Sequence, residues 1–230
     1  MKRNQSGFTL IEIAIVLVII GLLLGGVLKG QELINSAKVK NLATDFKNIP
    51  VYIYGYQDKF RALPGDDKKV TTHLTGATLA TTPVVADVGN GVINGTWDTL
   101  AQTDESYLFW QHVRLAGLAT GSTTPGATDY LPVNAVGGEI GIQSGSTTAP
   151  PIWADTAKTI PLRGTYIICS PGILGKFVKQ LDLQMDDGNT AGGSMMAGLG
   201  AGTGVAMTAV PTTGATKIDD ALTYTVCMGV

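Results

Sequence analysis

Residues whose side chains commonly do chemistry are sparse in this chain of 230 residues. The two histidines, His73 and His112, lie far from each other and from any cysteine, so their spacing does not build a zinc site. The sequence contains no Gly-x-Ser-x-Gly motif, no phosphate-binding loop ending in Gly-Lys-Thr and no complete Gly-x-Gly-x-x-Gly. We therefore expect no catalytic residues and no enzyme activity, with His112 in a structural or surface role.

The two cysteines, Cys169 and Cys227, each end the pattern Thr-Tyr-x-x-Cys. The segments 165–169 and 222–228 are rich in β-branched and aromatic residues, which predicts two strands. A disulfide between these strands closes a loop of about 58 residues and stabilises the fold by roughly 4 kcal/mol in the chain-entropy model. Two buried thiols are the alternative, and the compartment decides between them.

Residues 8–28 form an apolar run, FTLIEIAIVLVIIGLLLGGVL, with one charged residue, Glu12. At about 1.5 Å of helix rise per residue, a run of this length covers roughly 30 Å of hydrocarbon. Fifteen of its residues are Phe, Leu, Ile or Val, whose insertion energies outweigh the cost of one acid near the helix end. Lys2 and Arg3 precede the run with no acid beside them, which favours a cytoplasmic N-terminus. We therefore expect a single-pass membrane helix, with the rest of the chain outside the cytoplasm.

The residues at the start of this run also resemble a processing signal. A short basic leader precedes Gly7 and Phe8, and the acid Glu12 lies five positions after the glycine. An ordinary secretory signal places its small cleavage residues after the apolar stretch, whereas Gly7 comes before it. The sequence GFTLIE at 7–12 closely resembles the class III signal of bacterial type IV pilins and type II secretion pseudopilins. A plain signal anchor is the alternative.

The resemblance implies a processing and assembly route. Prepilin peptidase is expected to cut between Gly7 and Phe8, and the new amine of Phe8 is expected to be N-methylated. Glu12 is then expected to pair with the methylated amine of a neighbouring subunit, which fits the high cost of an ionisable group inside an apolar span. The alternative is that Glu12 reaches the nearby interface and does nothing specific. The implied partners are prepilin peptidase, other pilin or pseudopilin subunits, and inner-membrane lipid before assembly.

Beyond the span, apolar residues from Ile34 to Phe60 recur every three or four positions, which is the period of one helix face. The turn sequence LPGDD at 63–67 ends this pattern. We expect four parts, listed here by residue number: a leader at 1–7, a transmembrane and assembly helix at 8–28, an amphipathic helix at 29–62 and an extracytoplasmic head at 63–230. The expected fold class is α+β, in which the long N-terminal helix packs against a small antiparallel β-sheet, as in pilins.

Two shorter helices are expected in the head. Thr103 is a plausible cap for the first, which ends before Gly117. The second is expected to begin with Ser170 as its cap and Pro171 in its first turn, and to end at the Asp-Asp-Gly sequence 186–188.

Other stretches of the head lack any helical or strand period. Segments 119–129, 143–151 and 188–216 are rich in Gly, Thr, Ala or Pro and are expected to be surface loops. The segments RALPGDD at 61–67 and WQHVRLAGL at 110–118 also look like a group of uncharacterised pilin-like proteins. That likeness assigns no biochemical role to these segments.

Two oxygen-rich turns carry residues that could hold calcium: Asp87 with Asn90, and Asp186 with Asp187. Calcium takes six to eight oxygen ligands, and the pilin resemblance adds that type II pseudopilins use a calcium loop. Neither turn matches the EF-hand pattern, and ordinary Asn-Gly and Asp-Gly turn chemistry explains both equally well. No other cofactor is expected.

Composition narrows the function further. Lys and Arg number 16 against 18 Asp and Glu, so no positive field favours a phosphate backbone, and DNA is disfavoured as a partner. We expect a structural subunit of a type IV pilus or a type II secretion pseudopilus. The alternatives are a minor or tip pilin whose head binds a surface, a sugar or DNA, and a membrane-anchored enzyme, which the missing catalytic residues disfavour. A periplasmic head lies in an oxidising space, which favours the Cys169–Cys227 disulfide.

Overall fold

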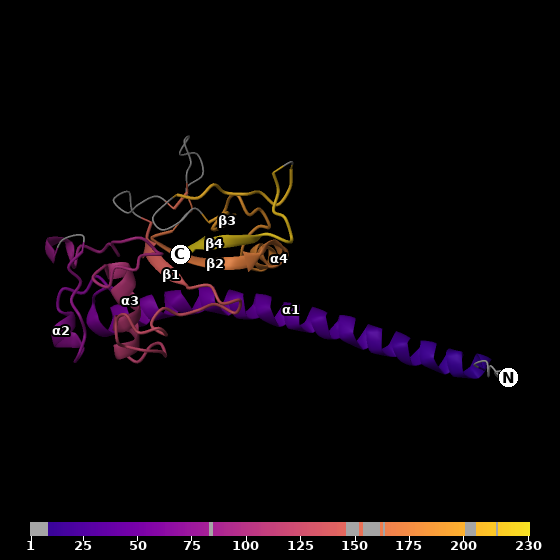
Figure 1. The fold of residues 1–230 in the computed structure, drawn as a ribbon. Coiled ribbons are helices and arrows are strands. Elements are labelled where there is room, and N and C mark those ends of the chain that lie inside the picture. Colours follow the sequence, from indigo (N-terminus) through magenta and orange to yellow (C-terminus); the bar gives the residue numbers. More distant parts are fainter. Residues whose placement is uncertain are drawn as a thin grey trace, which may run out of the picture. The chain divides into compact units, whose positions relative to one another are not determined.

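The computed structural model describes residues 9–82, 85–145, 152–153, 162, 164–200, 206–214 and 216–230. The expected cleavage and methylation residues, Gly7 and Phe8, lie outside the described residues. The chain divides into two compact units, Met1–Lys38 and Val39–Val230. Helix α1 (Leu10–Phe60) contributes residues to both units (Figure 1). The second unit is called the head below.

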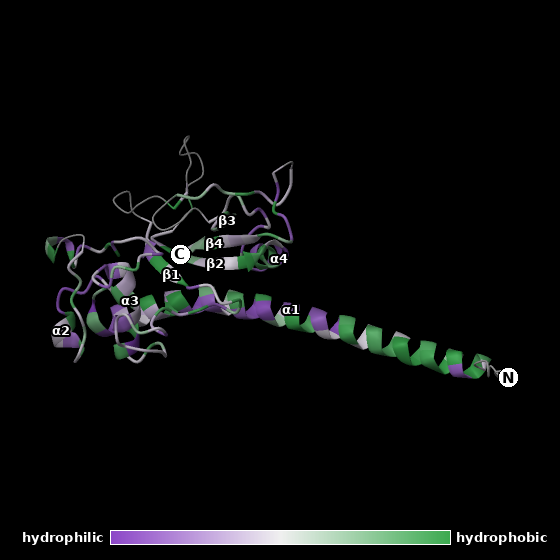
Figure 2. Cartoon of the chain, in the orientation of Figure 1, coloured by the Kyte–Doolittle hydropathy of each residue, from purple (hydrophilic) through white to green (hydrophobic). Residues whose placement is uncertain are grey.

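In the first unit, α1 is a strongly apolar helix, as its colouring in Figure 2 shows. Most of its described residues there are exposed. Exposure is 93% at Leu10 and 67% at Leu28. Among the described residues α1 is the one helix long and apolar enough to cross a membrane, and its most apolar stretch is not buried. So much uncovered apolar surface requires lipid or other protein chains around it.

In the head, the same helix buries one face. Its buried apolar residues follow one another at helical spacing and are Val39, Leu42, Phe46, Ile49 and Ile53, each at most 5% exposed. They join a core cluster that includes residues of the sheet and of the head's shorter helices. The head therefore has the predicted α+β, pilin-like architecture of a long helix packed against an antiparallel sheet.

The sheet has four antiparallel strands in the order β1-β2-β4-β3. Their bounds are β1 (Gly141–Ser144), β2 (Tyr166–Leu174), β3 (Met195–Gly198) and β4 (Thr223–Gly229). The two strands predicted around the cysteines are confirmed as β2 and β4. The strands β1 and β3 fall partly or wholly in segments expected to be loops, so that expectation was wrong there. Each is a four-residue edge strand, too short for a period-two pattern to show.

Besides α1, the described part of the chain contains four helical segments: α2 (Val70–His73), the 3-10 helix η1 (Val85–Asp87), α3 (Glu105–Leu115) and α4 (Gly175–Met185). Helix α3 begins two residues after the expected cap Thr103, with Asp104 as its cap.

The expected start of the second head helix at Ser170 and Pro171 was wrong. Ser170 and Pro171 belong to β2, and the helix begins at Gly175. The ladder with β4 shifts register after Ser170 and resumes with Ile173 opposite Tyr224. Gly172 takes φ +78° at this irregularity, a conformation that favours glycine. Strand pairing and burial of Ile173 thus override a local sequence that looks like a helix start.

The predicted disulfide between Cys169 and Cys227 is present, with an S–S distance of 2.07 Å. The two cysteines are direct partners in the ladder between β2 and β4, and both are fully buried. They lie in a second apolar cluster with Met196 and Met207. The bond therefore ties the two central strands of the sheet together within a core that water does not reach.

Candidate functional site

The N-terminus of α1 is held by a reciprocal pair of contacts between Thr9 and Glu12. The backbone N–H and the hydroxyl of Thr9 both donate to Oε2 of Glu12, each at 2.8 Å. In return, the backbone N–H of Glu12 donates to Oγ1 of Thr9 at 3.3 Å. This arrangement is a capping box, which satisfies donors that the first helical turn leaves free. The carboxylate of Glu12, expected from the sequence to act in assembly, is thus bonded within its own chain. Its role toward a neighbouring subunit stays a prediction.

In the head, the loop after α1 is built around two buried aspartates. Asp66 and Asp67 are 2% and 1% exposed. Asp66 accepts hydrogen bonds from the backbone N–H groups of Gly89, Asn90 and Gly91. The bond from Asn90 is 3.2 Å long and the bond from Gly91 is 2.7 Å long. One carboxylate therefore fixes the loop that follows η1 against the turn that ends α1.

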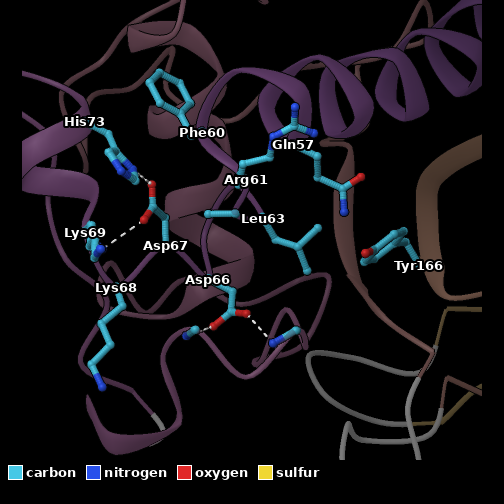
Figure 3. Close-up of a pocket in the computed structure, with 13 residues that line it drawn as sticks. Gln57, Phe60, Arg61, Leu63, Asp66, Asp67, Lys68, Lys69, His73 and Tyr166 are labelled. Carbon is cyan, nitrogen blue, oxygen red and sulfur yellow. Dashed lines mark hydrogen bonds and ion pairs between the residues drawn. The ribbon is translucent and has the colours of Figure 1, made fainter.

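Asp67 joins α1 to α2, and Figure 3 draws its contacts with His73 and Lys69. The hydroxyl of Tyr56 donates to Oδ2 of Asp67 at 2.8 Å, and Nδ1 of His73 lies 2.6 Å from the same oxygen. The other oxygen accepts the backbone N–H of Lys69 at 2.9 Å. The ring of Phe60 is tilted against that of Tyr56 and stacked on that of His73, with centroids 4.7 and 5.2 Å away. These contacts fix α2 against the end of α1.

His112 on α3 connects two loops from the centre of the head. Its Nδ1 accepts the backbone N–H of Gly65 at 2.9 Å, and its Nε2 lies 2.9 Å from the carbonyl oxygen of Thr78. Because Nδ1 accepts, Nε2 must carry the proton and donate to Thr78. Burial lowers the pKa of His112 to about 4, so the ring is neutral at physiological pH. This confirms a structural role for the residue within the described contacts.

Arg114, two residues further along α3, organises the following loop. Its guanidinium donates to the carbonyl oxygens of Thr120, Ser122 and Tyr130, with distances of 3.1 Å and 2.8 Å to the first two. The guanidinium also lies over the ring of Trp110, with its central carbon 5.9 Å from the ring centroid. In the stretch 110–118, which resembles other pilin-like proteins, His112 and Arg114 therefore position neighbouring loops by hydrogen bonds to their backbones.

Glu105, the first residue of α3, is a fully buried acid. Its Oε2 accepts the backbone N–H of Asn94 at 2.7 Å, while Oε1 has no hydrogen-bond partner within the described part of the chain. Burial raises the pKa of Glu105 to about 8, and the charges of Asp66 and Asp87 add to the shift. The side chain is therefore neutral in the folded head at pH 7, which lowers the cost of burying it.

A hollow of about 660 Å³ opens beside this region (Figure 3). Its apolar lining includes Leu63 and Tyr166, and the exposed basic residues Arg61, Lys68 and Lys69 also line it. The remaining lining residues are Gln57, Phe60, Ala62, Asp66, Asp67, His73, Gly89 and Gly91. Both aspartates accept backbone N–H groups, and Lys68 and Lys69 add exposed positive groups to the lining.

The two turns that could hold calcium make hydrogen bonds of their own, and calcium binding at either stays a prediction. The loop at Asp87 and Asn90 turns its backbone N–H groups toward Asp66. Asp186 accepts the backbone N–H groups of Ser194 and Met195 at 2.7 and 2.9 Å, and Asp187 accepts that of Asn189 at 2.8 Å. No group of three His, Cys, Asp or Glu residues is placed to hold a metal ion in the part of the chain that the structure describes. Turn chemistry accounts for both segments.

Comparison with known proteins bears on the N-terminal segment. A family model, the prokaryotic N-terminal methylation motif, matches residues 2–28. This motif is the class III signal of the type IV pilin and pseudopilin family, whose members are structural proteins and not enzymes. The motif leads into the apolar helix that the structure shows from Leu10 onward. Searches of the curated proteins and of the solved structures give no significant match.

The structure brings together residues that the sequence could not connect. The two stretches singled out by likeness, 61–67 and 110–118, meet through Gly65 and His112. The buried carboxyl of Glu105 was missed, because an acid in the first turn of a helix normally faces water. Gly65 packs against the backbone of Glu105, so an added Cβ atom there would clash with the carbonyl of Glu105.

Proposed function

We propose that the chain is the precursor of a structural subunit of a type IV pilus or a type II secretion pseudopilus. It is cut between Gly7 and Phe8, N-methylated on Phe8 and assembled through α1. The observation that carries the proposal is the methylation motif at 2–28, which is continuous with a helix of exposed apolar side chains. Before assembly that surface is covered by lipid, and afterwards by the same helix of other subunits.

The proposal includes a location and partners. The precursor spans the inner membrane once, with its N-terminus in the cytoplasm and its head in the periplasm. Lys2 and Arg3 before the apolar run and the buried disulfide of the head support this orientation. Prepilin peptidase acts first, and other pilin or pseudopilin subunits become the neighbours of the mature chain.

Mass spectrometry of the mature N-terminus tests the proposal. The expected product has 223 residues, seven fewer than the precursor of 230, and begins with a methylated Phe8. A Gly7→Glu variant is the matched control, because it replaces the residue before the cut and should keep residues 1–7. An intact Met1 in the wild-type protein, or a cut beyond residue 28, would contradict the proposal.

The hollow in the head favours a second candidate, a minor or tip subunit whose head binds an acidic ligand. Arg61, Lys68 and Lys69 line it as exposed cations. Binding of an acidic oligosaccharide, compared with its neutral counterpart, tests this role. The double variant Lys68→Ala with Lys69→Ala should weaken binding of the acidic form alone, and equal binding by wild type of both sugars would contradict it.

A further inference from the structure

The loop after η1 contains an exposed Asn-Gly pair, Asn90 and Gly91, that is held by a buried carboxylate. The backbone N–H of Gly91 donates to Oδ2 of Asp66 at 2.7 Å, and Figure 3 draws this carboxylate with its bonds to the loop. Asp66 is 2% exposed, whereas Asn90 and Gly91 are both exposed. The backbone nitrogen of Gly91 is thus in contact with a group that can accept its proton.

The side-chain amide of Asn90 is the electrophile next to this nitrogen in the chain. Its Oδ1 accepts the backbone N–H of Val92 at 2.8 Å, which forms an Asx turn with the residues that follow. The same N–H is placed to stabilise negative charge on Oδ1 when Cγ of Asn90 is attacked. Gly91 has no Cβ atom to shield its nitrogen, and its φ is +86°. A nucleophile with a base and an electrophile with an oxyanion donor therefore lie in adjacent residues.

We propose that Asn90 is converted to aspartate and isoaspartate in the folded head, with Asp66 as the base. The nitrogen of Gly91 bonds to Cγ of Asn90 and the Cγ–Nδ2 bond breaks. The proton that Asp66 takes from Gly91 leaves with Nδ2 as ammonia. Water then opens the five-membered imide at either carbonyl, so that one opening leaves aspartate and the other leaves isoaspartate. No oxidant or reductant takes part.

The surroundings of Asp66 support this role. Burial raises the pKa of the Asp66 carboxyl, which strengthens it as a proton acceptor, and the N–H groups of the loop offset part of that rise. Gly89 and Gly91 both line the hollow beside the loop, which gives water access to the imide. A second Asn-Gly pair, Asn94 and Gly95, follows in the same loop, but Asn94 is only 8% exposed.

Conversion at Asn90 would loosen the loop that Asp66 holds. Isoaspartate adds one carbon atom to the backbone before Gly91, which shifts the N–H groups that the carboxylate accepts. Aspartate instead adds a negative charge close to the buried carboxylate, where like charges repel. Both products weaken the attachment of this loop to the turn that ends α1, so the head changes with time after folding. The inference concerns the head alone and does not depend on assembly into filaments.

Peptide mapping of the full-length chain in detergent tests the reaction, because both Asn-Gly pairs are followed in one sample. The folded chain, and the same chain unfolded in guanidinium, are incubated at one pH and temperature. Mass spectrometry then measures aspartate and isoaspartate at each pair. Asn90 and Asn94 should convert at similar rates in the unfolded chain. Folding should accelerate conversion of Asn90 about tenfold and slow that of Asn94. Slower conversion of Asn90 in the folded chain than in the unfolded chain would overturn the proposal.

Substitution of Asp66 separates a base from a residue that only holds the loop. Asp66→Asn keeps the size of the side chain but removes the carboxylate, so conversion of Asn90 in the folded chain should fall about a hundredfold. A residue that only held the loop would give the opposite result, because the looser loop would convert faster, and that outcome would overturn the assignment. Should Asp66→Asn not fold, the comparison of folded and unfolded wild type decides.

Two further variants are the controls. Asp187→Asn is matched to Asp66→Asn, because Asp187 also accepts a backbone N–H, that of Asn189 at 2.8 Å, in a different loop. It should leave conversion of Asn90 unchanged. Asn90→Gln lengthens the side chain so that a six-membered ring would be needed, and it should abolish conversion at this position. Equal loss of conversion in Asp187→Asn and Asp66→Asn would contradict a specific role of Asp66.

Discussion

The backbone N–H of Gly65 donates a hydrogen bond to Nδ1 of His112 at 2.9 Å, joining residues 47 positions apart in the sequence. Gly65 adopts φ +90° and packs against the backbone of Glu105, where no side chain fits. The turn that ends α1 is thereby attached to both ends of α3. The buried apolar face of α1 is therefore held against the core by a polar contact as well as by its own burial.

This contact predicts that the head loses stability in mild acid. The pKa of His112 is about 4 in the folded head and about 6.5 in an unfolded chain, so the unfolded chain binds the proton first. The contribution of neutral His112 to the free energy of unfolding is complete above pH 6.5. It is lost as the pH falls toward 4, by about 3 kcal/mol in total. Chemical unfolding of the full-length chain in detergent at several pH values measures the slope.

A His112→Gln variant provides the comparison, since its amide does not titrate in this range. It is expected to be less stable than wild type at pH 7, with a smaller further loss between pH 6.5 and 4. An identical acid slope in wild type and variant would show that His112 is not the group responsible.

Glu105 predicts the opposite pH dependence. Its pKa is raised from about 4.5 to about 8 in the folded head. Its contribution to the free energy of unfolding is therefore greatest below pH 4.5 and decreases as the pH rises to 8. Glu105→Gln keeps an acceptor for the N–H of Asn94 and cannot ionise. The variant should therefore be more stable than wild type at pH 8, and its stability should vary less between pH 4.5 and 8. Thermal melting at pH 5 and pH 8 is the measurement, and a less stable variant at pH 8 would contradict the prediction.

Local sequence patterns were sufficient to predict several features of the fold. The apolar period of α1 and the β-branched residues around Cys169 and Cys227 identify elements whose burial depends on their own sequence. The disulfide followed from these two strands and from the expected compartment. These features could be predicted because one face or one pair of residues determines each of them.

Features that depend on distant partners could not be predicted in this way. Ser170 and Pro171 have the residue types of a helix start, but pairing with β4 keeps them in a strand. The edge strands β1 and β3 form because β2 and β4 offer free edges, and nothing in four residues signals this. The tautomer and burial of His112 depend on Gly65, which the helix pattern of α3 does not contain.

The disulfide predicts a large loss of stability on removal. Cys169→Ala with Cys227→Ala opens a loop of 58 residues, so the unfolded chain gains conformational freedom. The loss expected from the chain-entropy model is roughly 4 kcal/mol, and the missing sulfur atoms in the core add to it. Unfolding of the double variant beside the wild type, both non-reduced, measures the difference. A change below about 1 kcal/mol would show that the buried sheet does not depend on the bond.

The capping box at Thr9 and Glu12 allows the two tasks of the acid to be separated. Glu12→Gln keeps the oxygen that accepts from Thr9, since glutamine serves in the same box, but it removes the charge. If assembly requires charge pairing with the amine of Phe8, this variant should be inserted and processed normally yet form no filaments. Glu12→Ala, which loses both the cap and the charge, should likewise be inserted and processed but not assembled.

Thr9→Val is the complementary variant, because it loses the hydroxyl of the box and keeps the carboxylate. It should assemble, with a small reduction in yield from fraying of the first turn, since a lost cap costs about 1 kcal/mol. Filament yield and the state of the N-terminus are measured for all three variants in parallel. Normal filaments from Glu12→Gln together with none from Thr9→Val would reverse the assignment, because the acid would then act through the helix cap and not through its charge.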